Sequence, residues 1–361
     1  MTRQVISFLS KLKEEKLDGV LITKDENISY LTGYDSRESW LLVSPKGIFF
    51  FTDFRYFAEA KIGLKGISIV KINGSIFSLV ARFAKKLNLK QFGFESKNFS
   101  YAEYKKLKEE LSGSVDFVPT FDLIESLREI KTKDEIKKIR RAIKINIEGF
   151  KFIEKVIKPG LTERDLGFKL DDFIKAKGAD LAFETIVASG VNSAYPHARI
   201  SRRKLKKNEP VLIDFGVAFH GYRSDLTRIF FLGRIPLYFK RLYSEILAAQ
   251  QAAIKKIAAG VRVSQIDKCA RNFLSKKKLA KYFGHSLGHG IGRETHESPP
   301  ISSKIKERLS EGMVFTVEPA IYLPGKFGIR IEDIVLVKKD GCEVLSDSLD
   351  NSIKTRFEHS D

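Results

Sequence analysis

The sequence predicts an α/β domain followed by a larger α+β domain. The first third of the chain alternates short strand-like apolar runs with helical stretches, whereas the remainder groups long helices beside β-hairpins. A highly charged stretch, 125–135, separates the two patterns. With 361 residues, 43% of them hydrophobic, the chain is long enough to bury two cores. We therefore expect an N-terminal domain at 1–125 and a C-terminal domain at 126–361.

The expected elements of the N-terminal domain are short. Within 1–19, lysines and glutamates interrupt the apolar residues, which indicates an amphipathic helix and not a signal peptide. This domain contains no histidine and no dense carboxylate cluster, so we expect it to shape or cover a site and not to carry the chemistry. Strands are expected at 19–23, 40–44, 47–52, 67–72, 91–95 and 116–119, and helices at 54–61 and 77–87.

The C-terminal domain begins with helices. Thr132 and Glu135 form a capping-box pattern before a long apolar period, and a second helix is expected from Thr162 to about Lys177. Gly260 closes a third helix. The polar tail after Ser346 is expected to be loosely held. The other expectations are strands and hairpins at 183–231, helices at 237–259 and 263–278, and Gly-rich loops and strands at 284–345.

Composition narrows the setting and the partners. Two cysteines support neither a disulfide framework nor a thiolate metal site, and no apolar run of about 18 residues occurs. We therefore expect a reducing, cytoplasmic setting and no membrane partner. The net charge of +19 is uneven, with 19 basic and 16 acidic residues up to Glu125 against 45 and 29 beyond it. Scattered lysines without aromatic stacking motifs favour a solvated surface over a nucleic-acid interface.

Two aspartates lie in apolar strands that flank a tight turn. A turn centred between Phe219 and His220 would place Asp214 directly opposite Asp225. Opposed residues of an antiparallel pair share a face, with Cβ atoms about 4.5–5.5 Å apart. Two buried carboxylates at this separation repel each other and are costly to desolvate, and a multivalent cation is the simplest compensation.

A second hairpin repeats this arrangement. A turn centred on Gly325 would oppose Glu318 and Glu332. Arg330 precedes Glu332 by two residues and therefore shares its face. The two hairpins together would supply four carboxylates from strands, which are rigid supports.

Histidines add nitrogen ligands and proton carriers. Four glycines accompany the main histidine cluster, which argues against a helix and allows close backbone approach. His197 follows separately, and we assign no role to His220 or His359. The cluster holds three of the six histidines in twelve residues: His285, His289 and His296.

Four carboxylates with an imidazole form an oxygen-rich site. Such a site suits Mn²⁺, Co²⁺, Fe²⁺ or Zn²⁺, and four carboxylates can bridge two metals about 3.5–4 Å apart. Paired divalent ions activate water for hydrolysis. The competing interpretation is structural: the carboxylates could instead be neutralised by Arg223, Arg228 or Arg330.

The chain resembles the pita-bread metallopeptidases, within their aminopeptidase P and Xaa-Pro dipeptidase (prolidase) branch. The resemblance implies a creatinase-like N-terminal domain and a catalytic pita-bread domain. It covers nearly the whole chain and depends on these motifs: Asn27-Ile-Ser-Tyr-Leu-Thr-Gly33, Leu127-Arg-Glu-Ile-Lys-Thr-Lys-Asp-Glu135, Asp214-Phe-Gly, Gly221-Tyr-Arg-Ser-Asp-Leu-Thr-Arg228, Gly288-His-Gly-Ile-Gly292, His296-Glu-Ser-Pro299, Val317-Glu-Pro319 and Arg330-Ile-Glu-Asp333.

The resemblance also implies residue roles. Two divalent ions, foremost Mn²⁺ or Co²⁺, would be bound, and a metal-bridging hydroxide would attack the peptide. Glu318 would be both ligand and general acid–base. His285 and His296 would contact substrate and stabilise the oxyanion, His197 would close over the substrate, and Arg330 would orient the ligands. The implied metal ligands are Asp214, Asp225, His289, Glu318 and Glu332.

The implied reaction is hydrolysis of an Xaa-Pro bond, at a peptide N-terminus or in a dipeptide, by a homodimer. The alternative is a non-catalytic pita-bread protein that binds nucleic acid or a partner protein. Intact metal ligands favour catalysis. The departures from the family pattern are Tyr195, Arg293 and Thr295, which leave those ligands intact.

Overall fold

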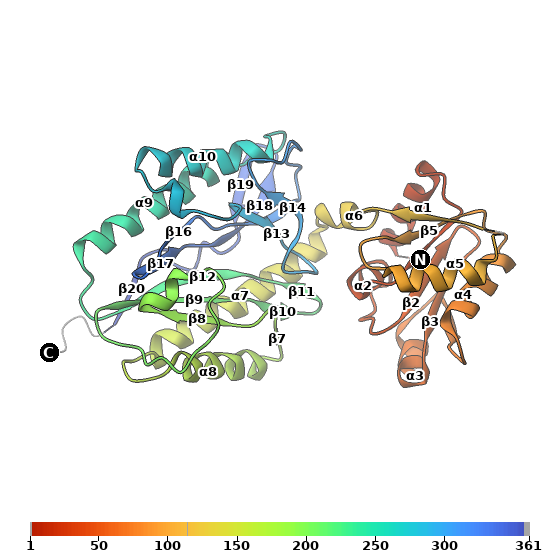
Figure 1. The fold of residues 1–361 in the computed structure, drawn as a ribbon, viewed down its shortest axis with the longest axis horizontal. Coiled ribbons are helices and arrows are strands. Elements are labelled where there is room, and N and C mark those ends of the chain that lie inside the picture. Colours follow the sequence, from red (N-terminus) through yellow and green to blue (C-terminus); the bar gives the residue numbers. More distant parts are fainter. Residues whose placement is uncertain (1, 114, 357–361) are drawn as a thin grey trace. The chain divides into compact units, whose positions relative to one another are not determined.

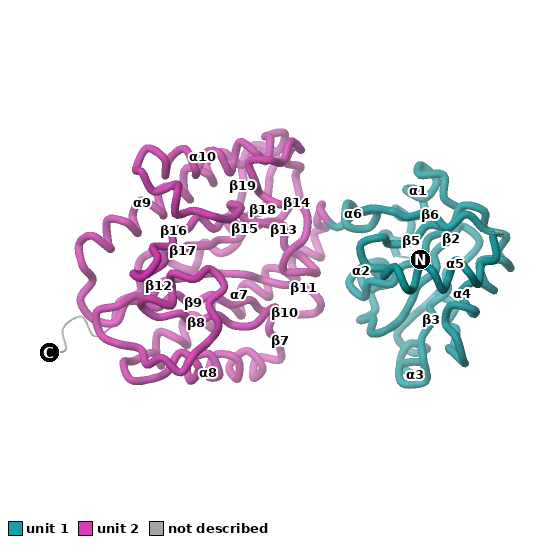
Figure 2. Tube along the Cα trace, in the orientation of Figure 1, with its two compact units in different colours: residues 1–128 teal, residues 129–361 magenta. Residues whose placement is uncertain are grey.

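The chain divides into two compact units, residues 1–128 and 129–361 (Figure 2). The computed structural model describes residues 2–113 and 115–356. The boundary falls within the short helix α6, Glu125–Glu129, close to the charged stretch that separates the two sequence patterns. Within the described residues, no helix combines the length and apolarity that crossing a bilayer requires.

Unit 1 is built on one mixed sheet in the order β4-β3-β2-β1-β5-β6 (Figure 1). The central strand β1 pairs antiparallel with β2 and parallel with β5. Buried apolar side chains fill both faces, which explains why β1 is buried at every position. The strands are β1 Gly19–Ile22, β2 Trp40–Ser44, β3 Gly47–Thr52, β4 Ser68–Lys71, β5 Gln91–Glu95 and β6 Asp116–Thr120.

Five helices flank this sheet. Three were expected, whereas the short helix at Asp25–Thr32 and the polar helix at Tyr101–Leu111 were missed. The second of these has a capping box, in which Ser100 and Glu103 satisfy each other's backbone N–H groups. The helices are α1 Arg3–Glu14, α2 Asp25–Thr32, α3 Phe54–Gly63, α4 Ile76–Lys86 and α5 Tyr101–Leu111.

Unit 2 places two helix pairs on opposite sides of its strands (Figure 1). The capping box of Thr132 and Glu135 starts the first helix, as predicted. The first pair covers one apolar core and the second pair covers the other. The third helix ends five residues before the predicted residue 259. The helices are α7 Lys133–Val156, α8 Glu163–Ala176, α9 Leu237–Ile254 and α10 Val263–Lys276.

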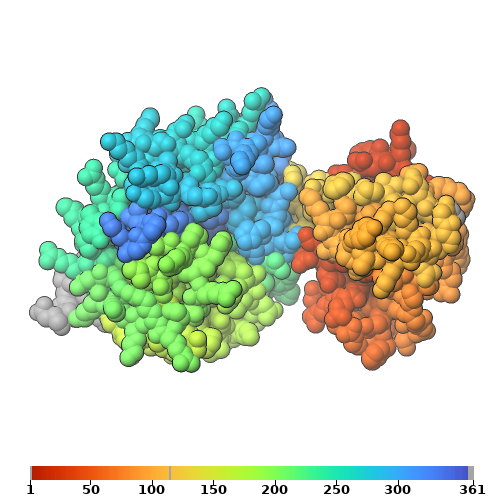
Figure 3. Space-filling model, viewed as in Figure 1, coloured from red at the N-terminus to blue at the C-terminus, as the bar shows by residue number. Residues whose placement is uncertain are grey.

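The strands of unit 2 form two larger and two smaller sheets. One larger sheet has the order β20-β12-β9-β8 and the other β14-β13-β15-β18-β19. On one face of the unit, segments from the middle and the end of the chain adjoin (Figure 3). The strands are β7 Asp180–Leu181, β8 Ile186–Ser189, β9 Glu209–Phe215, β10 Val217–Phe219, β11 Tyr222–Arg223, β12 Leu226–Leu232, β13 Gly288–Gly290, β14 Glu297–Ile301, β15 Val314–Val317, β16 Ala320–Leu323, β17 Phe327–Arg330, β18 Asp333–Lys338, β19 Gly341–Val344 and β20 Lys354–Arg356.

The expectation of a loosely held tail after Ser346 is wrong as far as Arg356. Strand β20 pairs in parallel with β12. Leu349 is buried, and its carbonyl accepts a hydrogen bond from the buried Arg228. Polar composition misled the prediction because long-range backbone pairing, together with the burial of Leu349 and the packing of Ile353, fixes this segment.

Candidate metal centre and active site

The first carboxylate hairpin has a different turn from the one predicted. Strand β10 pairs with β11 through Phe219 and Tyr222, which leaves a two-residue turn at His220-Gly221. Both turn residues have positive φ, 48° and 74°, as a type I′ turn requires. The pairing therefore opposes Asp214 to Thr227 and not to Asp225.

This corrected register keeps the two aspartates on one face. Asp225 precedes Thr227 by two residues, so the side chains of Asp225 and Thr227 point the same way. Asp214 and Asp225 are consequently diagonal neighbours, both are buried, and both line one cavity. The sequence-based expectation was wrong about direct opposition because it centred the turn one residue too early.

The second carboxylate hairpin has the predicted register. Val317 pairs with Asp333 on one side and Ala320 pairs with Arg330 on the other. Between these pairs, Glu318 and Glu332 occupy opposed positions where the regular ladder is interrupted. The interruption frees both carboxylates to reach into the same cavity.

His289 lies on the short strand β13, between β14 and β15. Glycines on either side allow this strand to lie unusually close to its neighbours. A Cβ atom at Gly288 would lie 1.9 Å from the Thr316 carbonyl oxygen, and one at Gly290 would lie 2.2 Å from that of Ser298. The glycines were predicted to let the backbone approach a metal or substrate; the structure shows that they let β13 approach its neighbouring strands.

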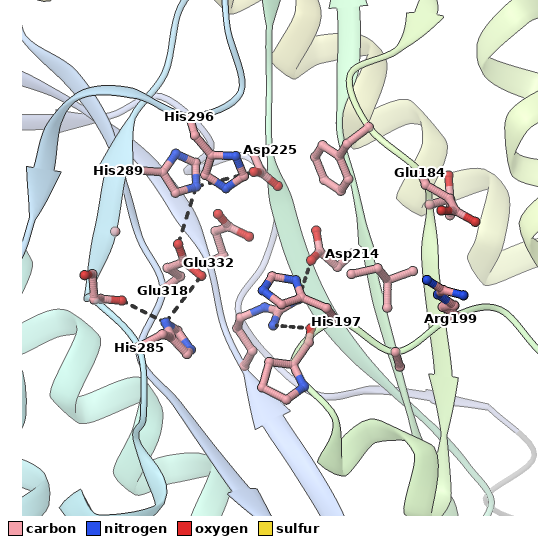
Figure 4. A pocket seen from close by; sticks show the side chains of 18 of the residues that line it. Glu184, His197, Arg199, Asp214, Asp225, His285, His289, His296, Glu318 and Glu332 are labelled. Carbon is pink, nitrogen blue, oxygen red and sulfur yellow. Dashed lines mark hydrogen bonds and ion pairs between the residues drawn. The ribbon is translucent and has the colours of Figure 1, made fainter. Parts of the chain in front are cut away.

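All the predicted site residues line one cavity of about 580 Å³ (Figure 4). Phe183, Glu184 and Arg199 also line it and were not predicted. Figure 4 shows Glu184 and Arg199 on the side away from His289. The predicted residues in the lining are His197, Asp214, Asp225, His285, His289, His296, Glu318, Arg330 and Glu332.

The closest cluster of ligand atoms surrounds His289. Its Nε2 lies 3.6 Å from Asp225 Oδ2 and 3.5 Å from Glu318 Oε1. Ligand atoms of Asp225, His289 and Glu332 all lie within 4.8 Å of one another. The Nδ1 of His289 donates to the Gly290 carbonyl at 3.1 Å, which directs the lone pair of Nε2 toward the carboxylates.

The protonation preferences of this cluster fit a bound cation. Burial and the nearby charge of Glu332 raise the pKa of Asp225 well above its usual range. Burial, followed by the charge of Glu318, does the same for Glu332. Burial raises the pKa of Glu318 to about 8 and lowers that of His289 to about 4. The site therefore disfavours uncompensated negative charge and keeps the imidazole neutral, which is the ligand form.

Two buried oxygens strengthen this fit. Oδ1 of Asp214 and Oδ1 of Asp225 are buried and have no hydrogen-bond partner. Buried carboxylate oxygens normally have a donor or a metal as partner. A donor set of four carboxylates and one imidazole therefore suits a divalent ion of the Mn²⁺, Co²⁺, Fe²⁺ or Zn²⁺ class.

Arginines neutralise only part of this charge. Arg330 contacts Asp214 and also donates to the Tyr322 hydroxyl at 2.7 Å. Arg228 instead pairs with Asp333 at 2.7 Å and donates to the Glu332 carbonyl. Arginine pairing therefore compensates one oxygen of Asp214 and leaves its other oxygen, like Oδ1 of Asp225, without a hydrogen-bond partner.

The remaining histidines differ in exposure. His285 is half-buried and accepts a hydrogen bond from the Tyr322 hydroxyl at 3.2 Å. His296 is exposed, and its ring centre lies 4.2 Å from that of His289. His197 is exposed at the cavity wall. His220 lies in the β10–β11 turn outside the cavity lining, and His359 lies outside the described residues.

Sequence reasoning missed Thr227 and Tyr322. Thr227 donates to Glu332 Oε2 at 2.7 Å and accepts from Arg330 Nε at 3.0 Å. A period of two would have found both, because Thr227 follows Asp225 by two residues and Tyr322 follows Glu318 by four.

Comparison with known proteins agrees with this geometry. Residues 137–339 match metallopeptidase family M24, and residues 5–130 match the creatinase/prolidase N-terminal domain. The chain is 33% identical to an Xaa-Pro dipeptidase of Pyrococcus horikoshii, over 95% of this chain and 96% of the relative.

Solved structures are similar over the whole chain. An Xaa-Pro dipeptidase from Bacillus anthracis superposes with a TM-score of 0.93 at 36% identity, covering 98% of this chain and 99% of that one. An X-Pro aminopeptidase from Thermotoga maritima superposes with a TM-score of 0.89 at 34% identity, covering 96% and 100%. The chain therefore belongs to metallopeptidase family M24, with a creatinase/prolidase N-terminal domain followed by a pita-bread domain.

Proposed function

We propose that this metallopeptidase hydrolyses the bond between an N-terminal residue and a following proline, in peptides or in Xaa-Pro dipeptides. The observation that carries the proposal is the convergence of four carboxylates and one imidazole in a single cavity. Relatives whose names specify Xaa-Pro substrates support the choice of bond. The proposed ligands of two divalent ions are Asp214, Asp225, His289, Glu318 and Glu332.

A proline-directed peptidase needs particular chemistry. The Xaa-Pro bond is a tertiary amide that lacks an N–H group, and the ring fixes φ. A peptidase that recognises its substrate through this N–H group therefore cannot bind an Xaa-Pro bond in that way. The proline nitrogen must also gain a proton before it leaves. Bound divalent ions would lower the pKa of a water molecule and polarise the scissile carbonyl.

Glu318 is the candidate general acid–base. It is half-buried, and its raised pKa suits a group that takes a proton from the attacking water. The same carboxylic acid would then deliver that proton to the proline nitrogen. His285 lies beside it, with Nδ1 at 4.0 Å from Glu318 Oε2.

The other polar groups would bind and orient the peptide. Although its surface is exposed, His296 is partly desolvated by the cavity walls, which lowers its pKa, so its neutral ring can donate one hydrogen bond to the developing oxyanion. His197, which also lines the cavity, would close over the substrate. Arg330 would hold Asp214 in place, because it is fixed by Tyr322 and Thr227.

Activity after metal exchange tests the proposal. Chelated protein would be reloaded with Mn²⁺, Co²⁺, Fe²⁺ or Zn²⁺ and given Ala-Pro or a tetrapeptide beginning with Ala-Pro. We expect alanine release with at least one metal, foremost Mn²⁺ or Co²⁺, and the ratio of the two rates distinguishes dipeptidase from aminopeptidase. Absence of cleavage with all four metals, together with salt-sensitive nucleic-acid binding, would instead support the non-catalytic alternative. Light scattering would test the expected homodimer.

A further inference from the structure

Helix α10 carries an ion pair that lies outside the cavity lining. Asp267 is fully buried, and Arg271 follows it by one helical turn. Arg271 Nε donates to Asp267 Oδ2 at 2.7 Å, and its Nη2 donates to Oδ1 at 3.1 Å. This bidentate pairing fixes the plane of the guanidinium.

The rest of this guanidinium faces the segment that carries His285. Nη1 of Arg271 donates to the Phe283 carbonyl at 3.0 Å, and Nη2 donates to the His285 carbonyl. The guanidinium also lies 4.4 Å from the centre of the Phe283 ring. One side chain therefore holds the backbone on both sides of Gly284.

Asp267 holds the other end of the same segment. Its Oδ1 accepts a hydrogen bond from the backbone N–H of Leu287 at 3.1 Å. The same N–H group also donates to the Ile301 carbonyl. The Leu287 carbonyl in turn accepts from the backbone N–H of Glu318 at 2.8 Å. The ion pair is thus connected to Glu318, the candidate acid–base, through the hydrogen-bonded peptide groups of Leu287.

The segment needs this external support. It joins the 3-10 helix Ala280–Tyr282 to strand β13 and has no regular structure of its own. Gly284 has no atom within 4 Å of an added Cβ, so packing does not restrict it. The ring of His285 nevertheless has defined partners, with Nδ1 donating to the Ser286 carbonyl at 2.8 Å and Nε2 accepting from Tyr322.

We infer that Asp267 and Arg271 are positioning residues that set the location of the His285 ring. This inference rests on the proposed peptidase function, in which His285 contacts the substrate. A lysine at position 271 would keep the charge opposite Asp267, but it has no planar fork to hold two carbonyls and the carboxylate together.

A double-mutant cycle tests the inference. We expect Arg271→Lys to lower kcat about 10- to 100-fold, the range for loss of a supporting group behind a site residue, with KM changed less than about threefold. In a His285→Ala background, the same substitution should change kcat less than about twofold, because the group on which it acts is already absent.

The controls separate positioning from general stability. Lys277 makes an exposed ion pair with Glu245 at 2.9 Å directly after α10, so Lys277→Gln should leave kcat unchanged. Asp267→Asn removes the carboxylate of the ion pair and is measured as the second variant in the same experiments. Equal effects of Arg271→Lys with and without His285, or wild-type kcat in Arg271→Lys, would overturn the inference.

A spectroscopic readout keeps the test independent of activity. In protein with ¹⁵N-labelled histidine, Arg271→Lys should shift the His285 ring signals and leave those of His220 in place. If no Xaa-Pro peptide is cleaved but the His285 signals shift, the proposed function fails while the positioning role stands. Unshifted His285 signals in both pair variants would overturn the positioning role.

Discussion

His289 and Asp225 face each other within the candidate metal site, with Nε2 and Oδ2 3.6 Å apart. The imidazole is fixed from behind by the Gly290 carbonyl, while the second oxygen of Asp225 is buried without a partner. This relationship leaves one lone pair and one carboxylate facing a common point. Such an arrangement suits the divalent ion that we propose these residues bind.

Removing His289, or the carboxylate of Glu318 that lies 3.5 Å from its Nε2, should reduce turnover strongly. We expect His289→Ala and Glu318→Gln each to lower kcat by at least about 10³-fold, since each removes a proposed ligand and Glu318→Gln also removes the acid–base group. His220→Ala, at the exposed β10–β11 turn, is the matched control and should retain activity. Peptide hydrolysis assays and metal analysis by mass spectrometry measure both effects. A near-normal rate in either site variant would contradict the assignment.

The metal-free protein should lose stability as pH rises. Burial raises the pKa of Glu318 from 4.5 to about 8, so the folded state binds more protons than the unfolded state between these values. Stability contributed by the protonated group is complete below pH about 4.5 and is lost as pH rises toward 8. Thermal unfolding of metal-free wild type and Glu318→Gln measures this, and the wild type should fall relative to the variant across that window.

Metal binding should stabilise the wild type more than Glu318→Gln. Saturating Mn²⁺ stabilises the folded state only where ligands are present and deprotonated. At pH 8, Mn²⁺ should therefore raise the unfolding temperature of wild type more than that of Glu318→Gln. If the unfolding temperatures of the two metal-free proteins change in the same way from pH 4.5 to 8, the Glu318 carboxyl does not cause the loss of stability.

Strand β13 should not tolerate a side chain beside His289. In Gly288→Ala, the new Cβ would lie 1.9 Å from the Thr316 carbonyl oxygen, and overpacking of this kind costs about 1–3 kcal/mol. We expect a lower unfolding temperature and weaker metal binding, because the strand must shift away from β15. Gly284→Ala is the control, since its Cβ meets no atom within 4 Å. Equal unfolding temperatures and metal affinities for the two variants would exclude the close-approach explanation.

Arg199 should influence the choice between dipeptides and longer peptides. It lines the cavity and is exposed, and no other described residue forms an ion pair with it. A free substrate carboxylate is the natural partner for such a guanidinium. Arg199→Ala should raise KM for Ala-Pro several-fold and leave KM for Ala-Pro amide unchanged. Glu184→Gln, on the same side of the cavity, serves as the comparison. Equal changes for acid and amide would show that Arg199 does not bind the carboxylate.

Local patterns predicted much of the fold correctly. The capping box at Thr132 starts α7, and the limits of β2 and β3 match the predicted runs. The Pro324-Gly325 turn set the register that opposes Glu318 and Glu332. These features depend on neighbouring residues, so short-range physics is enough to specify them.

The two errors, in the first hairpin and in the segment after Ser346, have separate origins. The His220-Gly221 turn displaced Asp225 from its predicted partner, because a non-glycine residue adopted positive φ. The segment after Ser346 was misjudged because parallel pairing with β12 holds it. The turn is a local feature whose centre the prediction misplaced by one residue, whereas the position of the segment after Ser346 depends on contacts far along the chain.

By itself, the sequence determined which side chains we propose for the chemistry: carboxylates placed two by two on hairpins and histidines placed among glycines. Only the tertiary structure decided that these hairpins share a cavity with Arg199 and that Tyr322 contacts His285 and Arg330. It likewise decided that Asp267 and Arg271 hold the His285 segment from α10. The physical reason is range. Turn and cap preferences act over a few residues, whereas burial, desolvation and backbone approach arise only when distant segments pack together.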